Sequence, residues 1–394
     1  MFAKRTRWEM QTNRLTRALA AQRAAGVPVL DLAESNPTKC GFAYDSAAIL
    51  RALCNPAALT YHPDPRGLLA AREAVAKYYA ARAVRISCDD IFLTASTSEA
   101  YTYALRLLCD PGDSILIPTP SYPLFDYLAG IQDVELARYP LFYDHGWQID
   151  FHALESAITD RTRAIVVVHP NNPTGHYCKP EEMRKLSEIC AARGLALIGD
   201  EVFFDFTFLS KTAVELQVQT FAGESPALTL VLNGLSKSCG LPQMKVAWMC
   251  VGGPEELRRS AVERLEVIAD TYLSLGTPAQ LVVPTLLEGF QAFQDQVRAR
   301  VQGNLAELDR QLAGAKSCTR LEVEGAWTVV LRVPATRSDE DLALALVEKK
   351  NVYVHPGHFY DFPSDGYLVA SLIVPEQAFS NGVARVVELI DGGT

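Results

Sequence analysis

The sequence predicts an α/β fold with two domains, a large domain with a mostly parallel sheet and a smaller α+β domain. The chain has 394 residues, which is enough for two hydrophobic cores. Up to Gly276, short apolar runs alternate with helical stretches, and strands that are apolar on both faces are typical of parallel sheets covered by helices. After Gly276 this alternation ends, which indicates a second domain.

The large domain is expected over residues 41–275. Six apolar runs bounded by turn residues predict its strands, at residues 91–94, 114–117, 164–168, 195–199, 228–233 and 245–251. Helical periodicity separates these runs most clearly at residues 98–108, 180–192 and 254–273. Strands and helices that alternate in this way form parallel sheets.

The smaller domain is expected to combine residues 1–40 with residues 276–394. Its C-terminal part is predicted to hold a long helix, a strand, a second helix and two further strands, at residues 279–313, 327–333, 339–349, 352–355 and 368–373. The N-terminal part is predicted to hold a helix at residues 9–24 and a strand at residues 29–32. We expect these N-terminal elements to pack against the C-terminal ones.

The composition is that of a globular protein, with 49% hydrophobic and 21% charged residues. A formal net charge of −9 without a basic block argues against a nucleic-acid or anionic-membrane partner. No apolar run approaches the roughly 18–20 residues of a transmembrane helix, and the N-terminus lacks the apolar core of a secretory signal. Nine cysteines without a CxxC pair indicate neither a disulfide framework nor a metal site. We therefore expect a cytoplasmic protein.

Three polar side chains follow the ends of predicted strands. Asn172, Asp200 and Lys237 each come shortly after one of the buried apolar runs. Taken singly, such residues are more often an Asn-Pro turn, an N-cap aspartate and a solvated surface lysine. Because the carboxyl ends of parallel strands face one crevice, where open α/β folds bind ligands, we expect the three side chains to converge there.

The segments Asn172-Pro-Thr-Gly, Asp200-Glu-Val-Phe and Ser236-Lys237, in this order, resemble the aminotransferase class I/II family. The resemblance covers nearly the whole chain. It implies fold-type I of the pyridoxal-phosphate enzymes, with pyridoxal 5′-phosphate held as a Schiff base on Lys237. It also implies a homodimer that acts on a small-molecule amine and a keto acid.

The residue types suit the roles that the resemblance implies. A lysine can form the Schiff base and then move the substrate Cα proton when burial or a neighbouring cation lowers its pKa, as is expected of Lys237. Asp200 resembles the family carboxylate that keeps the pyridine nitrogen protonated, so that the ring can accept electrons. Asn172 resembles the asparagine that donates to the ring hydroxyl. Lys237 and Asp200 are therefore the catalytic candidates.

The other cofactor-binding candidates supply hydroxyls and aromatic rings. A predicted strand-to-helix junction offers Thr97 and Ser98 to the phosphate at a helix N-terminus, and the same pattern is also typical of a capping box. Ser236 adds a hydroxyl beside the lysine. Tyr122 resembles the family aromatic that stacks on the pyridine face. Tyr61 resembles the tyrosine that reaches the phosphate in the neighbouring subunit.

Three positions near the cofactor depart from the family pattern. Phe203 stands where a tyrosine usually donates to the ring oxygen, and phenylalanine cannot donate. Gly234 stands where a small hydroxyl often binds the phosphate, so Ser236 or Ser238 is expected to substitute for it. Lys245 stands where an arginine usually binds the phosphate, and it offers a point charge instead of a planar fork.

A fourth departure concerns the substrate. Val369 stands where the family has an arginine that grips the substrate α-carboxylate through two parallel hydrogen bonds. Three explanations stay open: a substrate without the usual carboxylate, a carboxylate bound by another residue, or a shifted alignment register. The candidate substitutes nearby are His355, His358 and Arg332.

Transamination between an amino compound and a keto acid is the leading functional prediction. The alternative is a lyase reaction of the same cofactor, such as carbon–sulfur β-elimination or decarboxylation, because it would use the same residues. A non-catalytic cofactor-binding sensor is a third interpretation. The missing arginine favours the sensor mildly, whereas Lys237, Asp200 and Asn172 together count against it.

Overall fold

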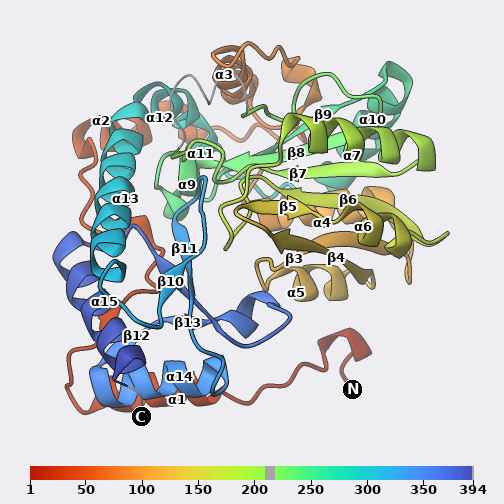
Figure 1. The fold of residues 1–394 in the computed structure, drawn as a ribbon. Coiled ribbons are helices and arrows are strands. Elements are labelled where there is room, and N and C mark those ends of the chain that lie inside the picture. The colour runs from red at the N-terminus through yellow and green to blue at the C-terminus, as the bar shows by residue number, and fades with distance from the viewer. Residues whose placement is uncertain (209–217, 393–394) are drawn as a thin grey trace.

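The computed structural model describes residues 1–208 and 218–392. Figure 1 shows a large sheet with helices on both faces and, beside it, a smaller sheet built by the C-terminal part of the chain. Within the described residues the large sheet has the strand order β2-β9-β8-β7-β6-β3-β4-β5. Its strands are β2 (Ile91–Thr94), β3 (Ser114–Thr119), β4 (Glu135–Tyr143), β5 (Trp147–Ile149), β6 (Thr162–Val168), β7 (Ala196–Asp200), β8 (Thr229–Gly234) and β9 (Ala247–Gly252).

The centre of the large sheet is parallel. β4, β3, β6, β7 and β8 run in one direction, whereas β9 is antiparallel to both of its neighbours, and β5 is antiparallel to β4. The prediction of a mostly parallel sheet is confirmed. Because neighbouring parallel strands end at the same edge, the carboxyl ends of β6, β7 and β8 lie side by side.

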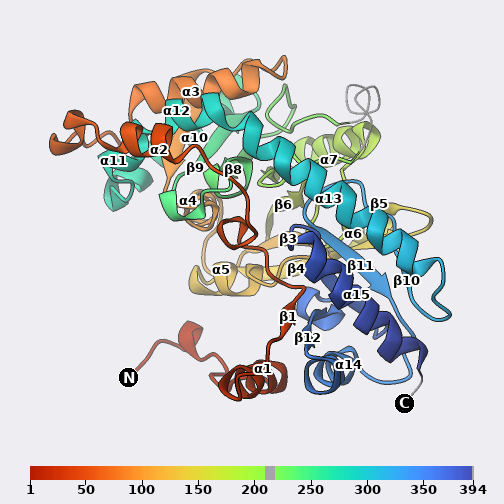
Figure 2. The same cartoon turned by 90° about the vertical axis from the view of Figure 1, so that its left-hand side faces the viewer.

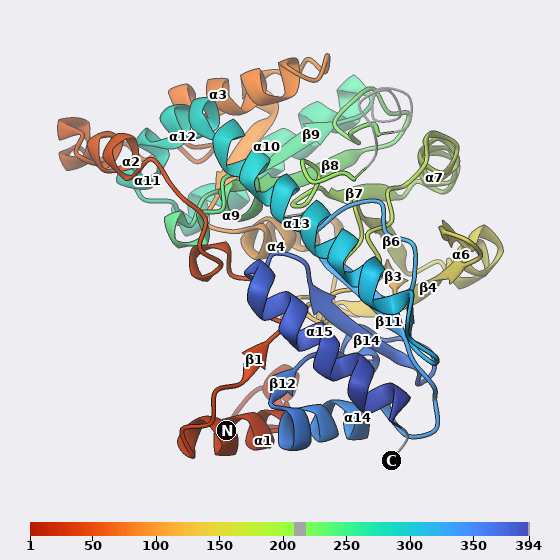
Figure 3. The same ribbon diagram turned by 60° about the vertical axis from the view of Figure 1, so that its left-hand side comes forward.

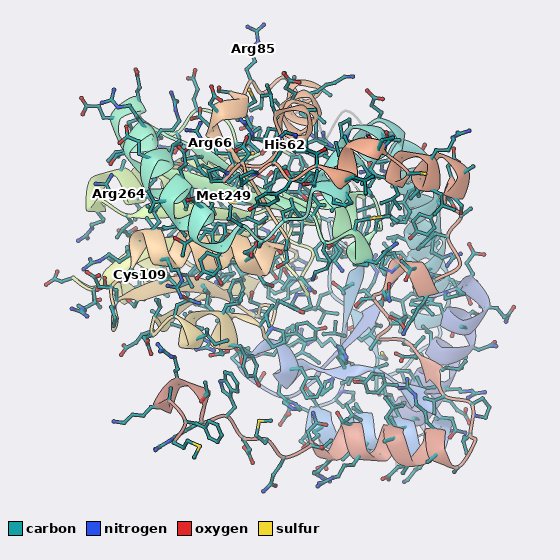
Figure 4. The ribbon with its side chains drawn as sticks, turned by 180° about the vertical axis from the view of Figure 1, so that it is seen from behind. His62, Arg66, Arg85, Cys109, Met249 and Arg264 are labelled. Carbon is teal, nitrogen blue, oxygen red and sulfur yellow. The ribbon has the colours of Figure 1, made fainter. Side chains whose placement is uncertain are left out.

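Alternate residues of the central strands pack into two hydrophobic cores, which explains the continuous apolar runs. Ile165 packs with helices on one face, and Val166 packs with helices on the other. Figure 4 shows Met249 within the sheet, whereas Arg85 projects outward. The helices on the face of Ile165 are α3 (Leu69–Ala80), α6 (Phe151–Ala157), α7 (Pro180–Arg193) and α12 (Val283–Gly289). The helices on the face of Val166 are α4 (Thr97–Leu108), α5 (Phe125–Ile131) and α10 (Glu255–Tyr272).

The smaller sheet is antiparallel, with the order β10-β11-β14-β13. Its strands are β10 (Thr319–Arg320), β11 (Thr328–Arg332), β14 (Tyr367–Ser371) and β13 (His355–Pro356). Two helices, α13 (Gln291–Leu312) and α15 (Glu376–Asp391), lie side by side and cover one face of this sheet (Figure 3). Its other face is turned to the large sheet, since Val330 and Val369 belong to the same hydrophobic core as Ile165.

The N-terminal segment returns to the C-terminal part of the chain. β1 (Leu30–Asp31) pairs in parallel with β12 (Val352–Tyr353), and α1 (Arg14–Ala24) lies beside α14 (Asp339–Ala345) (Figure 2). The expected packing of these elements is therefore confirmed, whereas the domain boundaries stay a prediction. The other helical elements are α2 (Ser46–Leu53), α9 (Leu235–Ser238), α11 (Thr277–Leu281), a π-helical turn (Leu346–Lys350) and 3₁₀ turns at Lys4–Thr6, Pro37–Lys39, Pro56–Leu59, Cys88–Asp90, Pro242–Met244 and Gly357–Tyr360.

The structure corrects the sequence-based prediction at three places. The long helix predicted at 279–313 is wrong: the segment forms α11, α12 and α13, with Pro284 in the first turn of α12. The helix predicted from residue 9 begins at Arg14, because the Asn13 side chain accepts the Thr16 N–H at 2.7 Å. β4 and β5 were not predicted, since they alternate buried and exposed residues near the sheet edge. None of the described helices is long and apolar enough to cross a membrane.

Candidate active site

A cavity of about 460 Å³ lies where the large sheet meets the smaller one. Its walls come from the carboxyl ends of β6, β7 and β8, the start of α4, the helix α9 and the inner face of β11 and β14. Figure 1 shows α9 and β11 at the same end of the large sheet. Three larger hollows, of about 960, 910 and 520 Å³, are lined in the described part of the chain by none of the predicted site residues.

Lys237 lies in the short helix α9, which follows β8 directly. The residue is half-buried and lines the cavity, and its Nζ lies 5.0 Å from the ring of Trp327 and 5.3 Å from the ring of Phe203. Burial disfavours the charged ammonium and lowers the pKa of Lys237 to about 8. At neutral pH a substantial fraction of this amine, roughly a tenth, is therefore unprotonated and can act as a nucleophile or a base.

Gly234 precedes this helix, and its lack of a side chain has a steric reason. A Cβ atom at this position would lie 2.8 Å from the Cβ of Ala247 and 2.9 Å from the carbonyl oxygen of Val246. The close pairing of β8 with β9 therefore leaves no room for the hydroxyl residue that the family often has here. Ser236 lines the cavity, whereas Ser238 is fully buried and donates to the Gly234 carbonyl at 2.8 Å.

Asp200 ends β7 and is buried at the floor of the cavity. Burial raises the pKa of Asp200 to about 6, and hydrogen bonds from the Val202 N–H and the Tyr101 hydroxyl partly oppose this rise. The Tyr101 hydroxyl donates to Oδ2 at 3.0 Å, and the Val202 N–H donates to Oδ1 at 3.2 Å. Above pH 6 the site thus holds a buried carboxylate without a cationic partner among its hydrogen bonds, which suits a ligand with a protonated ring nitrogen.

Tyr101 was missed by sequence reasoning. It lies on α4 one turn after Ser98, so the predicted helix would already have placed both residues on the same face. The hydroxyl of Tyr101 orients the carboxylate of Asp200, and its ring lines the cavity.

Asn172 and Phe203 both line the cavity beside these groups. The Oδ1 atom of Asn172 is buried without a hydrogen-bond partner in the described part of the chain. Unpaired buried amide atoms are rare, and a polar ligand atom would supply the missing partner. Phe203 packs edge-on against Trp327 with 5.4 Å between ring centroids, so it contributes an apolar wall and no donor.

The start of α4 presents hydroxyls and free backbone N–H groups to the cavity. Ser96 is the N-cap: its Oγ accepts the Glu99 N–H at 3.2 Å, and a Glu99 oxygen accepts the Ala95 N–H at 2.7 Å. The predicted Ser96 cap is thus present, whereas the reciprocal bond to Glu99 comes from Ala95 and not from Ser96, so the capping box is incomplete. Thr97 and Ser98 lie on the cavity wall. A helix N-terminus with such hydroxyls suits a phosphate dianion.

The remaining predicted residues divide into two groups. Tyr122 lines the cavity and is 47% exposed. Lys245 is exposed in a left-handed turn with φ of 53° and does not line the cavity. Tyr61 is 71% exposed and lines a separate hollow of about 140 Å³. Within one described chain, therefore, Lys245 and Tyr61 are not brought to the other candidates.

The wall on the side of the smaller sheet carries residues that sequence reasoning missed or left open. Val369 is buried there, 2% exposed, together with Trp327 and Ser371. Of the candidate substitutes for an arginine, His355 lines the cavity, whereas His358 and Arg332 are exposed and lie outside it. An aromatic residue after Gly325-Ala326 and a serine two positions after Val369 would have been the signals in the sequence.

These groups fit pyridoxal 5′-phosphate. The cavity offers a lysine amine with a lowered pKa for the aldehyde and a buried carboxylate for the pyridine nitrogen, and the Asn172 amide beside them has an unpaired oxygen that can accept a hydrogen bond from a ligand. The start of α4 offers a phosphate site, and Tyr122 and Phe203 add apolar surface.

Comparisons with known proteins agree with this fit. Residues 29–371 match the aminotransferase class I and II family. The chain is 31% identical over 361 residues to the alanine aminotransferase of Mycobacterium tuberculosis, covering 88% of this chain and 81% of that protein. It is 28% identical over 349 residues to the glutamate-pyruvate aminotransferase AlaA of Escherichia coli, covering 86% and 84%.

Solved structures show the same fold. The alanine aminotransferase from Pyrococcus furiosus superposes with a TM-score of 0.91 over 100% of both chains, at 23% identity. An aminotransferase from Escherichia coli gives a TM-score of 0.88 over 100% of this chain and 98% of the other, also at 23% identity. This likeness confirms the predicted fold-type I architecture, and the family match confirms the cofactor pyridoxal 5′-phosphate. The chain belongs to the aminotransferase class I and II family.

Proposed function

We propose that this pyridoxal-phosphate-dependent aminotransferase exchanges an amino group between an amino compound and a keto acid, with Lys237 as the group that moves the substrate Cα proton. The observation that carries the proposal is the buried Lys237 amine, with its pKa near 8, in one cavity with the Asp200 carboxylate. When bound, the cofactor supplies the aldehyde carbon that receives the amino group and the ring that takes up electrons.

Lys237 is placed for proton transfer by its surroundings. Its Nζ lies over the rings of Trp327 and Phe203, which exclude water from one side of the amine and accommodate its charge when it is protonated. A base whose pKa lies near the working pH combines a useful unprotonated fraction with enough basicity to take a proton. Lys237 therefore has the basicity that the proposed step requires.

Asp200 is the group that binds the nitrogen of the cofactor's pyridine ring. Its carboxylate is fixed by Tyr101 and by the Val202 N–H, so that both oxygens keep one orientation. An ionised carboxylate in a buried site favours a protonated ring nitrogen far more than the same pair would in water. Asp200 stabilises the protonated ring nitrogen only while the carboxyl is ionised. We therefore expect this stabilisation to weaken as the pH falls below about 6.

Val369 bears on which amino donors the enzyme accepts. No arginine lines the cavity in the described part of the chain, and Lys237 is the one lysine there. A desolvated substrate carboxylate without a charged partner costs about 2–5 kcal/mol, or a factor of roughly thirty to several thousand in specificity. We therefore propose that aspartate, glutamate and alanine are poor amino donors, although relatives are named for alanine and for glutamate and pyruvate.

A steady-state assay with purified protein tests the reaction type. Candidate amino donors are supplied with and without pyruvate or 2-oxoglutarate, and amino-acid and keto-acid concentrations are followed by chromatography. Transamination consumes the added keto acid in a one-to-one ratio with the donor. Release of a new keto acid without any added acceptor would instead support carbon–sulfur β-elimination, and loss of carbon dioxide would support decarboxylation.

We further propose a homodimer in which Tyr61 reaches the partner's cofactor phosphate. Tyr61 is 71% exposed and lies outside the cavity of its own chain, as a residue serving a neighbouring subunit would. Sedimentation equilibrium tests the association. Mixing an inactive Lys237→Ala chain with an inactive Tyr61→Ala chain tests the shared site, because a mixed dimer regains one intact site. A monomeric active enzyme would refute this part.

A further inference from the structure

We propose that the enzyme recognises its amino donor through an uncharged polar group, such as a carboxamide, that hydrogen-bonds to Ser371, Trp327 and His355. The inference rests on the proposed function, because it concerns the substrate of the same cavity.

Strand register places the binding wall. Val369 and Ser371 are two positions apart on β14 and therefore point to the same face of the smaller sheet. His355 on β13 pairs with Val369, and Thr328 on β11 pairs with Ser371. Directly opposed residues share a face, with Cβ atoms roughly 4.5–5.5 Å apart. All four residues line the cavity, so they form one continuous patch of its wall.

This wall carries hydrogen-bond groups that the protein itself leaves unpaired. The Oγ of Ser371 and the Nε1 of Trp327 are buried and have no hydrogen-bond partner among the described residues. Both residues are nearly inaccessible, with 2% and 1% of their surface exposed. Trp327 directly precedes β11, and it lines the same cavity as Ser371. Buried donors without partners are unfavourable, and two of them in residues that line one cavity indicate a ligand that accepts hydrogen bonds there.

His355 adds a third group. Its Nδ1 lies 2.9 Å from the hydroxyl of Tyr360, which leaves Nε2 for other partners. The groups around the imidazole are Tyr360, Tyr353, Phe359 and Val369, none of which carries a charge at neutral pH. Burial lowers the pKa of His355 to about 4, so the ring is neutral under ordinary conditions. It is a polar contact and not a cation.

The charges of the cavity favour an uncharged ligand group at this wall. Lys237 is the one lysine or arginine that lines the cavity in the described part of the chain, and it is already assigned to the cofactor and to proton transfer. The ring nitrogen is assigned to Asp200 and the start of α4 to the phosphate, so no cationic group of the described chain is left to pair with a substrate carboxylate. A carbonyl of a carboxamide or an ester accepts the same hydrogen bonds without this penalty, and Val369 supplies apolar contact beside it.

Binding of a matched pair of ligands to the cofactor-loaded enzyme tests the proposal. L-Alaninamide and L-alanine have the same size and chirality, and each is titrated without a keto acid while the visible absorption of the cofactor is followed. Affinities are compared per concentration of free amine, because the amide lowers the basicity of the amino group. We expect alaninamide to bind at least tenfold more tightly than alanine.

Variants identify the binding wall. Ser371→Ala and Trp327→Phe should each weaken alaninamide binding about three- to tenfold and change alanine binding less than twofold. Ser364→Ala and Trp8→Phe are the matched controls, because both residues are exposed and lie outside the cavity, and they should change neither affinity. Val369→Arg should reverse the preference in favour of alanine.

Two outcomes would overturn the inference. Alanine binding as tightly as alaninamide, with both affinities lost together in Ser371→Ala, would show that this wall binds a carboxylate. Alanine binding that strengthens tenfold or more as the pH falls toward 5, and that His355→Phe abolishes, would show that protonated His355 is the carboxylate's cation. A preference for alaninamide without keto-acid consumption would instead refute the proposed transamination and leave this inference standing.

Discussion

Replacing Asp200 by asparagine separates the stability of the protein without cofactor from its ability to bind the cofactor. Asparagine has nearly the same size. Its oxygen can accept the Val202 N–H and its amide N–H can donate to the Tyr101 hydroxyl, so the change removes the charge and can keep both contacts. The pKa of Asp200 lies at about 6 instead of its usual 3.8 because the carboxyl is buried. A pKa difference of this size corresponds to about 3 kcal/mol. The free energy of unfolding is lower by this amount when the carboxyl is ionised in both the folded and the unfolded chain.

The sign of this effect depends on pH. Below pH 3.8 the carboxyl is protonated in the folded and the unfolded chain, so Asp200 costs no stability there. Between pH 3.8 and about 6 the unfolded chain ionises first, and the free energy of unfolding falls as the pH rises. Above pH 6 the full cost is present. We therefore expect Asp200→Asn to stabilise the cofactor-free protein by up to about 3 kcal/mol at pH 8, and by much less at pH 4.5.

Urea unfolding of the cofactor-free proteins, followed by tryptophan fluorescence at both pH values, measures this difference. Asp270→Asn is the matched control, since Asp270 is exposed on α10 and its change should stay within about 0.5 kcal/mol. Adding pyridoxal phosphate should reverse the order, because only the wild type offers a carboxylate to the ring nitrogen. A cofactor-free Asp200→Asn protein that is less stable than the wild type at pH 8 would refute the reasoning.

Four further predictions concern the same site. Borohydride reduction followed by peptide mapping should find the cofactor on Lys237, and Lys237→Met should lack the visible band; an adduct on another lysine would contradict the assignment. Phe203→Tyr should lower the pKa at which the visible band titrates, because a donor to the ring oxygen stabilises the deprotonated linkage; a rise or no change would mean that residue 203 does not face that oxygen. Tyr101→Phe should weaken cofactor binding most near pH 6, because loss of its hydrogen bond raises the pKa of Asp200 further. Equilibrium dialysis from pH 5.5 to 8 measures the affinity for the cofactor, and a loss of affinity that does not depend on pH would contradict this prediction. Val369→Arg should speed single-turnover reaction with aspartate, glutamate or alanine at least tenfold, whereas rapid reaction of the wild type with these donors would show that another residue binds the carboxylate.

Much of the large sheet could be predicted from the sequence because its central strands are buried on both faces. The runs at β6, β7 and β8 are continuously apolar, so their position does not depend on knowing which face meets the core. β4 and β5 have mixed patterns, and only their pairing at the sheet edge stabilises them as strands. The predicted helix 279–313 fails for a related reason, since helical periodicity alone does not reveal where a chain changes direction.

The sequence by itself determined that Asn172, Asp200 and Lys237 lie at one edge of the sheet, because parallel strands end together whatever the rest of the fold does. The catalytic roles of these residues stay predictions. Only the tertiary structure decided that Gly234 leaves no room for a hydroxyl and that Tyr101 orients Asp200. Only the tertiary structure likewise decided that Lys245 stays outside the cavity.

The ionisation of the site was also decided by tertiary structure. The lowered pKa of Lys237 and the raised pKa of Asp200 both result from burial, and part of the cavity wall that buries them comes from the smaller sheet. Trp327 is 90 residues further along the chain than Lys237, yet its ring lies 5.0 Å from the amine. Local sequence specifies which groups are present, whereas desolvation depends on distant segments that pack over them, and for that reason the chemistry of this cavity could be stated only once the fold was known.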